Sequence, residues 1–374
     1  MNTIRVLIVD DSRFMQQALS KLFASEPRIE VIGFASDGFE AIERRKELNP
    51  DVITLDVMMP RLNGIETVRQ LMSNAPVPIV MVSSYTAAGA RYTVEALSLG
   101  AIDHVLKPGH SVSLDLDLIA EELISKVLMA SRIRPIRNAP LTKKPIRKKA
   151  IDLDKLKKPP KAALKPPLNK KNWKANQPHL IAIGASTGGP ALLRYLFSQL
   201  PADYPIPITV VQHITPSFHG ELLRIFNRVT PLSVVSPREG EKPQPGNIYL
   251  ASPRAHLTIN RNYRFRLVDG EPVDGHVPSA TRLIESAAEA YGSLALGMIL
   301  TGMGTDGAAG MRSLAERGGQ VYILEEASCV VYGMPKAVLD EGVPAEALGK
   351  TDLAEVLLRV AGYQTSETAA SRSS

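Results

Sequence analysis

Short apolar runs alternate with amphipathic segments along the first third of the chain. Runs rich in Val, Ile and Leu are typical of buried strands, and the segments between them repeat apolar positions at helical spacing. The predicted strands are 4–9, 30–35, 51–55, 78–83 and 103–106, and the predicted helices are about 13–23, 38–48, 64–73, 87–99 and 115–131. Strict alternation with short connections predicts an α/β domain built on a doubly wound, five-stranded parallel sheet. Its ligand site is expected at the carboxyl ends of the strands.

The same alternation returns from residue 179 onward. The predicted strands are about 180–185, 206–212, 232–236, 247–251, 294–300 and 319–324, and the predicted helices are about 190–200, 217–229, 279–291, 306–317 and 351–361. Residues 258–268, with a turn at 260–262, look like an inserted hairpin. We therefore predict a second doubly wound, Rossmann-like domain whose sheet is mostly parallel with an antiparallel edge.

Between these regions the apolar periodicity is lost. Residues 132–178 hold 16 Lys and Arg against two acidic residues, a local charge of +14. The whole chain carries +6, so the remainder carries −8, and the basic charge belongs to a linker rather than to a nucleic-acid-binding face. Proline and like charges predict an exposed, semi-stiff tether. Attraction to an acidic receptor array or to the inner membrane surface is a second interpretation of it.

These patterns divide the chain into four parts. The predicted parts are a first domain at 1–125, a linker at 126–178, a second domain at 179–363 and a frayed tail at 364–374. No apolar run approaches the length of a membrane span, and the N-terminus enters a strand directly, so neither membrane insertion nor a signal peptide is expected. A single cysteine, Cys329, excludes an internal disulfide framework and a cysteine-based metal site. We expect a cytoplasmic protein.

Polar residues gather at the strand ends of the first domain. Asp10 and Asp11 end the first strand, Asp56 the third, Ser83 the fourth and Lys107 the fifth. Three carboxylates this close repel one another unless a cation is present, and oxygen ligands suit Mg²⁺. A lysine and a hydroxyl opposite them are able to hold a phosphoryl group. The alternative is that each acidic residue caps the helix that follows it.

Three polar residues also sit at predicted strand ends of the second domain. Ser186 follows an apolar run and precedes two glycines, His213 ends a second run and Asp306 follows a third. A serine needs an adjacent base to attack a carbonyl, and the base needs an acid that fixes its tautomer. Such a triad requires the three strands to be neighbours in the sheet. The alternatives are that Ser186 and Thr187 cap a helix in a Gly-rich turn, that His213 is a buried core residue and that Asp306 is an N-cap.

The first 125 residues resemble the response-regulator receiver domain. The resemblance is carried by Asp10-Asp11, Asp56 followed by Met59-Pro60 and Gly64, Ser83, and Lys107-Pro108. It implies that Asp56 takes a phosphoryl group from a histidine kinase. It also implies that Asp11, Asp56 and the Met58 carbonyl bind Mg²⁺, with Asp10 one shell further out, and that Ser83 and Lys107 hold the phosphate. His104 stands where Tyr or Phe is usual, and Met58 stands where an acidic residue is frequent.

The second domain resembles the chemotaxis protein-glutamate methylesterase family, CheB. The resemblance is carried by Gly184-Ala185-Ser186-Thr187-Gly188-Gly189, Gln212-His213, Thr301-Gly302-Met303-Gly304 with Asp306-Gly307-Ala308, and Val331-Tyr332-Gly333-Met334-Pro335. It implies a nucleophile at Ser186, a general base at His213 and an orienting Asp306. It also implies an oxyanion site that includes the Met303 backbone N–H, with Thr187 beside it.

The same resemblance implies a substrate and partners. The substrate is a glutamate γ-methyl ester on a methyl-accepting chemoreceptor, and some receptor glutamines are deamidated by the same acyl chemistry. A CheA-type histidine kinase supplies the phosphoryl group, and an opposing methyltransferase acts on the same receptor sites. The esterase needs no cofactor. The unphosphorylated receiver is expected to pack over Ser186 and to block access, and phosphorylation at Asp56 to bias the pair open.

Some positions depart from the family pattern, and two other functions remain open. Thr305 stands where Asn is usual, Thr281 where Asp is usual, and Leu324-Glu325-Glu326 replaces a more polar run. One alternative is a response regulator whose output domain only binds. The other is a conventional α/β-hydrolase, which requires an essential late histidine such as His276.

Overall fold

The first domain is built on one parallel sheet. The structure, a computed structural model, describes residues 3–83, 87–107, 112–133 and 178–363. The strands of this sheet are β1 (Ile4–Val9), β2 (Ile29–Ala35), β3 (Val52–Asp56), β4 (Ile79–Ser83) and β5 (Asp103–Leu106), in the order β2-β1-β3-β4-β5. Every neighbouring pair is parallel, as predicted. Most of the predicted linker (134–177) and the predicted tail (364–374) lie outside the described residues.

Helices cover both faces of this sheet. They are α1 (Arg13–Phe23), α2 (Gly38–Leu48), α3 (Gly64–Asn74), α4 (Ala87–Ser98) and α5 (Val112–Ala130), each within three residues of the prediction at either end. On one face α1 and α5 bury an apolar cluster that includes Phe23 and Val127. On the other face the cluster includes Val68 and Leu71 of α3. The apolar stripes of α1, α3 and α5 thus face the sheet, as the sequence periodicity requires.

The second domain contains a seven-stranded sheet that is parallel throughout. Its order is β14-β13-β12-β6-β7-β9-β8. The strands are β6 (Leu180–Ala185), β7 (Ile208–Gln212), β8 (Ser233–Val235), β9 (Asn247–Leu250), β12 (Ala295–Ile299), β13 (Gln320–Leu324) and β14 (Glu346–Leu348). The strands β6, β7 and β12 are buried along their whole length, which accounts for their unbroken apolar runs.

The predicted antiparallel edge is wrong. Both edge strands, β8 and β14, pair in parallel with their neighbours. The hairpin predicted at 258–268 is present, but β10 (His256–Ile259) and β11 (Phe265–Val268) form a separate two-stranded sheet. This hairpin packs against the helix α8 (Ala280–Tyr291) because Leu257 and Phe265 bury their side chains in the same cluster as that helix. The three-residue strand β14 has no apolar run and was missed by the sequence pattern.

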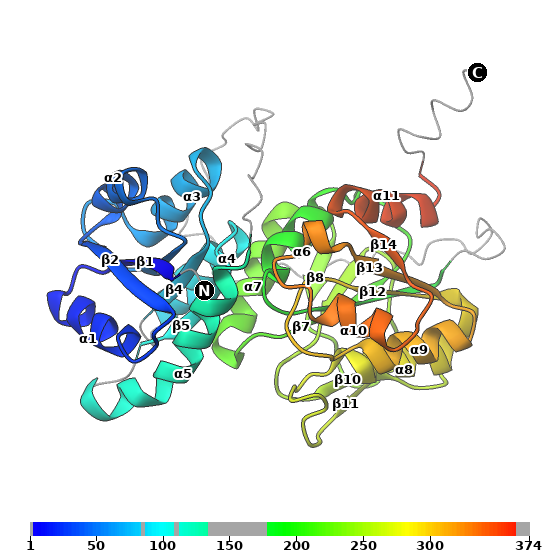
Figure 1. Ribbon diagram of the computed structural model, residues 1–374. Helices are drawn as coiled ribbons and strands as arrows, with labels where there is room; N and C mark the ends of the chain where they lie inside the picture. Colours follow the sequence, from blue (N-terminus) through cyan, green and yellow to red (C-terminus); the bar gives the residue numbers. More distant parts are fainter. Residues whose placement is uncertain (1–2, 84–86, 108–111, 134–177, 364–374) are drawn as a thin grey trace, which may run out of the picture.

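Helices again form two layers around this sheet (Figure 1). On one face lie α6 (Gly189–Ser198), α7 (Pro216–Val229) and α11 (Lys350–Val360), and on the other lie α8, α9 (Ala308–Glu316) and α10 (Met334–Asp340). Short 3-10 turns, η3 (Gly292–Leu294) and η4 (Glu326–Ser328), complete the domain. The helix α10 begins with Met-Pro and has only seven residues, too few for its periodicity to be recognised in the sequence.

The two domains pack against each other through α4 of the first and α6 and α7 of the second (Figure 1). Ala90 and Val94 of α4 are buried within the apolar cluster of the second domain. At the same boundary the ring of His104 packs on Phe218 of α7, with ring centroids 4.6 Å apart. Burial lowers the pKa of His104 to about 4, so this ring is neutral at physiological pH. No helix among the described residues has the length and apolar content that a membrane span requires.

Candidate active site

The sheet order brings three of the predicted residues to one edge. Ser186 follows β6, His213 follows β7 and Asp306 lies beyond the end of β12, and these strands are adjacent in the order β12-β6-β7. The carboxyl ends of parallel strands lie at the same edge, so residues 120 positions apart meet there. The strand adjacency that a triad requires is therefore present.

The turn around Ser186 depends on glycines. The backbone N–H of Gly189 donates to the Ser186 carbonyl at 2.8 Å, which closes the turn between β6 and α6. Gly188 has a φ of +79°, a conformation that other residues rarely adopt. A Cβ on Gly302 would lie 2.7 Å from the Cβ of Ser186. The close packing of the two loops is thus possible only because residue 302 has no side chain.

Asp306 is fully buried and binds the histidine directly. Its Oδ2 lies 2.8 Å from Nε2 of His213 and also accepts the Ala280 backbone N–H at 2.7 Å. Its Oδ1 accepts from the Ser279 hydroxyl at 2.7 Å and from the Thr281 N–H at 2.9 Å. Burial alone would raise the pKa of Asp306, but these hydrogen bonds, with His213 first, lower it to about 2. The N-terminus of α8 thereby holds a permanent carboxylate next to the imidazole.

This contact determines which nitrogen of His213 is basic. A carboxylate only accepts hydrogen bonds, so Nε2 carries the proton and Nδ1 keeps a free lone pair. Nδ1 is buried and makes no hydrogen bond to any described residue. The Ser186 hydroxyl also makes none within the described chain, although both residues line the same cavity. The site therefore combines a histidine nitrogen that has a free lone pair with a serine hydroxyl that has no hydrogen-bond partner among the described residues.

Two further loops complete the edge around Ser186. The Thr301 hydroxyl lies 3.0 Å from the Thr187 carbonyl and accepts the Val331 backbone N–H at 2.9 Å, which ties three loops together. No described residue accepts the backbone N–H of Met303, a residue that is 58% exposed. The backbone N–H of Met303 therefore has no hydrogen-bond acceptor among the described residues, and its loop packs against Ser186 through Gly302.

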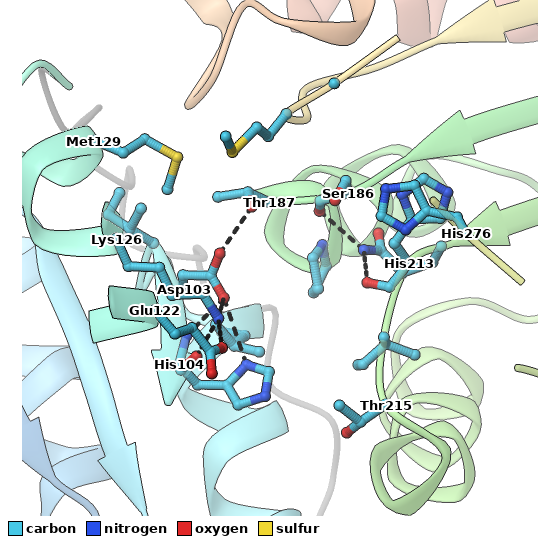
Figure 2. A pocket seen from close by; sticks show the side chains of 18 of the residues that line it. Asp103, His104, Glu122, Lys126, Met129, Ser186, Thr187, His213, Thr215 and His276 are labelled. Carbon is cyan, nitrogen blue, oxygen red and sulfur yellow. Dashed lines mark hydrogen bonds and ion pairs between the residues drawn. The ribbon is translucent and has the colours of Figure 1, made fainter. Parts of the chain in front are cut away.

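The cavity at this site lies between the two domains (Figure 2). It has a volume of about 570 Å³, and its walls include Ser186 and His213 from one domain and Asp103 and Lys126 from the other. The Thr187 hydroxyl donates to Asp103 Oδ2 at 2.8 Å across the boundary. Lys126 Nζ lies 3.2 Å from Asp103 Oδ1 and 2.6 Å from Glu122. The first domain therefore forms one wall of the candidate active site.

The first domain carries the predicted acidic cluster at its own strand ends. Ligand oxygens of Asp10, Asp11 and Asp56 lie within 4.8 Å of one another. Helix capping is not their role, because α1 is capped by Ser12 and α3 by Asn63. The sequence alternative that each acidic residue caps a helix is therefore wrong for Asp10 and Asp56.

Lys107 and Ser83 also lie where they were predicted. Lys107 Nζ lies 2.8 Å from Asp10 and 2.7 Å from Asp56, so two buried carboxylates share one ammonium group. Burial raises the pKa of Asp56, Lys107 offsets this in part, and the charge of Asp10 adds to it. The Ser83 hydroxyl is fully buried and has no partner among the described residues. The excess of negative charge and the oxygen donors fit a divalent cation such as Mg²⁺.

Residues that the sequence pattern did not assign also support the site. His256 is fully buried, donates from Nε2 to the Glu271 carbonyl and accepts the Ser279 N–H at Nδ1. Thr281, a departure from the family pattern, accepts the Gly307 N–H at 2.7 Å and so positions the loop of Asp306. The local sequence carried no signal for these roles, because each residue contacts a partner more than 20 positions away along the chain.

The comparisons with known proteins agree with this geometry. The class of protein is therefore a two-domain α/β protein, in which one domain carries a receiver-type acidic cluster and the other a serine-hydrolase-type site. Residues 6–117 match the family described as response regulator receiver domain, and residues 181–357 match CheB methylesterase. The chain belongs to the CheB methylesterase family with an N-terminal receiver domain.

Relatives match along almost the whole chain. A protein-glutamate methylesterase/protein-glutamine glutaminase of Symbiobacterium thermophilum is 38% identical over 361 residues, 96% of this chain and 97% of that one. The protein of the same name from Thermotoga maritima is 38% identical over 96% of this chain and 98% of its own. The crystal structure of the Thermotoga maritima CheB catalytic domain covers 49% of this chain and 98% of that one at 34% identity, with a TM-score of 0.47. That of the response regulator domain covers 36% and 100% at 48% identity, with a TM-score of 0.34.

Proposed function

We propose that this chain is a protein-glutamate methylesterase and protein-glutamine glutaminase that removes methyl groups from chemoreceptors and is activated by phosphorylation. Membership of the CheB methylesterase family and the names of the full-length relatives support the reaction class. The observation that carries the chemistry is the His213–Asp306 contact beside Ser186, which leaves Nδ1 as the free base. A binding-only output domain would have no need of a buried carboxylate that fixes this tautomer.

The reaction proceeds by acyl transfer. The Ser186 hydroxyl attacks the γ-carbonyl of the glutamate ester while Nδ1 of His213 takes its proton, and Asp306 holds the resulting imidazolium. The protonated His213 then gives this proton to the leaving methoxide, so methanol departs and an acyl-enzyme remains. Water, deprotonated by the same nitrogen, hydrolyses that ester and regenerates Ser186. With a glutamine substrate the leaving group is ammonia.

The backbone N–H of Met303 is proposed as a donor to the oxyanion. It has no acceptor among the described residues and belongs to the loop that packs against Ser186 through Gly302. A fixed donor stabilises the charge that develops on the carbonyl oxygen without reorganisation cost. Thr187, whose hydroxyl binds the first domain, becomes available to substrate only when that domain moves.

The test of this activity is methanol release from methylated chemoreceptors by the full-length protein. Ser186→Ala is expected to abolish release above background, and His213→Ala to do the same. Ser313→Ala, in helix α9, is the matched control and retains the wild-type rate. Full activity of Ser186→Ala would refute the acyl-enzyme mechanism. An essential His276 with a dispensable His213 would favour the α/β-hydrolase alternative instead.

The first domain is proposed to control access to this site. A histidine kinase of the CheA type transfers a phosphoryl group to Asp56, where bound Mg²⁺ would neutralise charge on the carboxylate and the phosphate. Asp11, Asp56 and the Met58 carbonyl would hold the ion, with Asp10 in its outer shell, while Ser83 and Lys107 contact the phosphoryl oxygens. The Asp103–Thr187 contact and the burial of α4 support a closed resting state.

Phosphorylation then biases the equilibrium toward an open state in which a receptor helix reaches Ser186. Adding a small phosphodonor and Mg²⁺ is expected to raise methanol release by the wild-type protein. Asp56→Asn should keep the resting rate and lose the stimulation. Equal stimulation of both proteins would show that Asp56 is not the acceptor. The opposing methyltransferase is proposed to restore the esters at the same receptor sites.

A further inference from the structure

A second histidine lies against the proposed general base. The rings of His213 and His276 are stacked, with centroids 3.7 Å apart and an angle of 15° between their planes. Both side chains border the cavity that contains Ser186, and the close view shows the two rings over each other (Figure 2). Asp306 makes no hydrogen bond to His276. Its hydrogen bonds go to His213 and to the residues at the start of α8.

A tight turn holds His276 in place. Its backbone N–H donates to the Val273 carbonyl at 3.0 Å, and the Val273 N–H returns the bond at 3.1 Å. The two residues between them, Asp274 and Gly275, have φ values of +51° and +79°, as a two-residue hairpin turn requires. On the other side, Pro278 is buried and the Ser279 hydroxyl donates to Asp306. The backbone on both sides of His276 is thus fixed by hydrogen bonds within the site.

The stack supplies a constraint that Asp306 alone does not provide. One hydrogen bond at Nε2 fixes the position of that atom, but the imidazole plane is still able to turn about it. A ring packed flat on the imidazole fixes the plane, and with it the direction of the Nδ1 lone pair. Because proton abstraction requires this lone pair to point at the serine hydroxyl, small rotations lower the rate steeply.

His276 is also suited to lie next to a histidine that becomes charged. The groups that face it are His213, Asp306 and Asp274. Burial lowers the pKa of His276 and the neighbouring His213 lowers it further, while Asp306 and Asp274 oppose this in part, so the net shift favours the neutral ring. A neutral aromatic face is attracted to the cation it covers and excludes water from it.

We propose that His276 is a positioning residue for the general base, which holds the plane of the His213 imidazole toward Ser186 by ring stacking. This inference rests on the proposed esterase function and adds a residue to its machinery. It assigns no proton transfer to His276 itself. An aromatic ring without titratable atoms is therefore sufficient at this position.

Three substitutions in the full-length, phosphodonor-activated protein distinguish the effect of the aromatic ring of His276 from the effect of its polar nitrogens. His276→Phe keeps an aromatic face, His276→Gln keeps polarity without a ring, and His276→Ala removes both. We expect Gln and Ala to lower kcat about tenfold or more with KM changed less than about twofold, and Phe to remain within about threefold of wild type. His219→Phe, on α7 and outside the cavity, is the matched control and keeps the wild-type kinetics.

Two further readouts distinguish positioning from a general loss of structure. The rate at which a fluorophosphonate labels Ser186 depends on the Ser186–His213 pair and not on a receptor, so it should fall in parallel with kcat for Gln and Ala. The pH profile of kcat/KM should keep its shape in the Phe variant, because the proposal assigns no proton transfer to His276. If the Ala variant unfolds, the Phe and Gln variants decide the matter.

Several outcomes would overturn the proposal. Wild-type kcat in the Gln variant would show that the ring is not needed, and a Phe variant as slow as Ala would assign chemistry to the imidazole. A rise in KM at unchanged kcat would make His276 a substrate contact. These outcomes are distinct from failure of the esterase function, which would appear as undiminished methanol release by Ser186→Ala.

Discussion

Removal of the Asp103 carboxylate is expected to raise the activity of the unphosphorylated protein. Asp103 Oδ2 accepts the Thr187 hydroxyl at 2.8 Å and is the polar contact between the first domain and the loop that carries Ser186. Asp103→Ala removes this bond without stranding a charge, because Lys126 keeps Glu122 at 2.6 Å and also donates to the His104 carbonyl. The substitution therefore weakens the closed state, and it also removes the contacts of Asp103 to Lys126 Nζ and to the His104 N–H within the first domain.

The size of the effect follows from the type of bond. A hydrogen bond to a charged group contributes about 1.5–3 kcal/mol, and the Asp103 side chain is 15% exposed, which favours the lower end. A loss of about 1.5 kcal/mol lowers the ratio of closed to open molecules by slightly more than about tenfold. The resting rate should rise by about the same factor while the closed state still dominates. The rate of the fully phosphorylated protein is the upper limit for the resting rate of the variant.

The assay is the initial rate of methanol release from methylated receptors without a phosphodonor. Glu43→Ala removes an exposed carboxylate of α2, remote from the boundary, and should leave the resting rate unchanged. Thr187→Ser retains a hydroxyl and should keep the resting rate low. A resting rate of Asp103→Ala equal to wild type, with normal stimulation by a phosphodonor, would refute the reasoning that this contact holds the domains closed.

Three other perturbations test the site and its control. Asp306→Asn should lower kcat about 10³–10⁴-fold by favouring the wrong tautomer of His213. Because the pKa of Asp306 is lowered to about 2, its carboxylate contributes roughly 2 kcal/mol of stability above about pH 4, lost as pH falls toward 2, so the acid unfolding curve of this variant should be flatter. Gly302→Ala should cost about a hundredfold in kcat, since its Cβ would lie 2.7 Å from the Ser186 Cβ, whereas Gly220→Ala, with open space around it, should be neutral. Chelation of divalent cations should abolish stimulation by the phosphodonor and leave the resting methanol release unchanged.

The order of strands and helices was predictable because it depends on local patterns. Buried strands such as β6 and β7 need unbroken apolar runs, and the helices need one apolar stripe, so both leave periodic signals in the sequence. The short elements β14 and α10 leave none. The pairing of the edge strands was predicted wrongly because parallel and antiparallel partners present the same local pattern. The hairpin β10–β11 joined neither edge, since its apolar side chains pack on α8.

The sequence by itself determined which side chains stand at strand ends, and so which residues are able to act at Ser186 and at Asp56. Only the tertiary structure decided how they meet. The adjacency of β12, β6 and β7 joins His213 to Asp306, and the start of α8 supplies the N–H groups that keep that carboxylate charged. The stacking of His276 and the reach of Asp103 into the site depend on loops and domains that pack across long sequence separations. No local pattern encodes those contacts, because each arises from the mutual placement of separately folded elements.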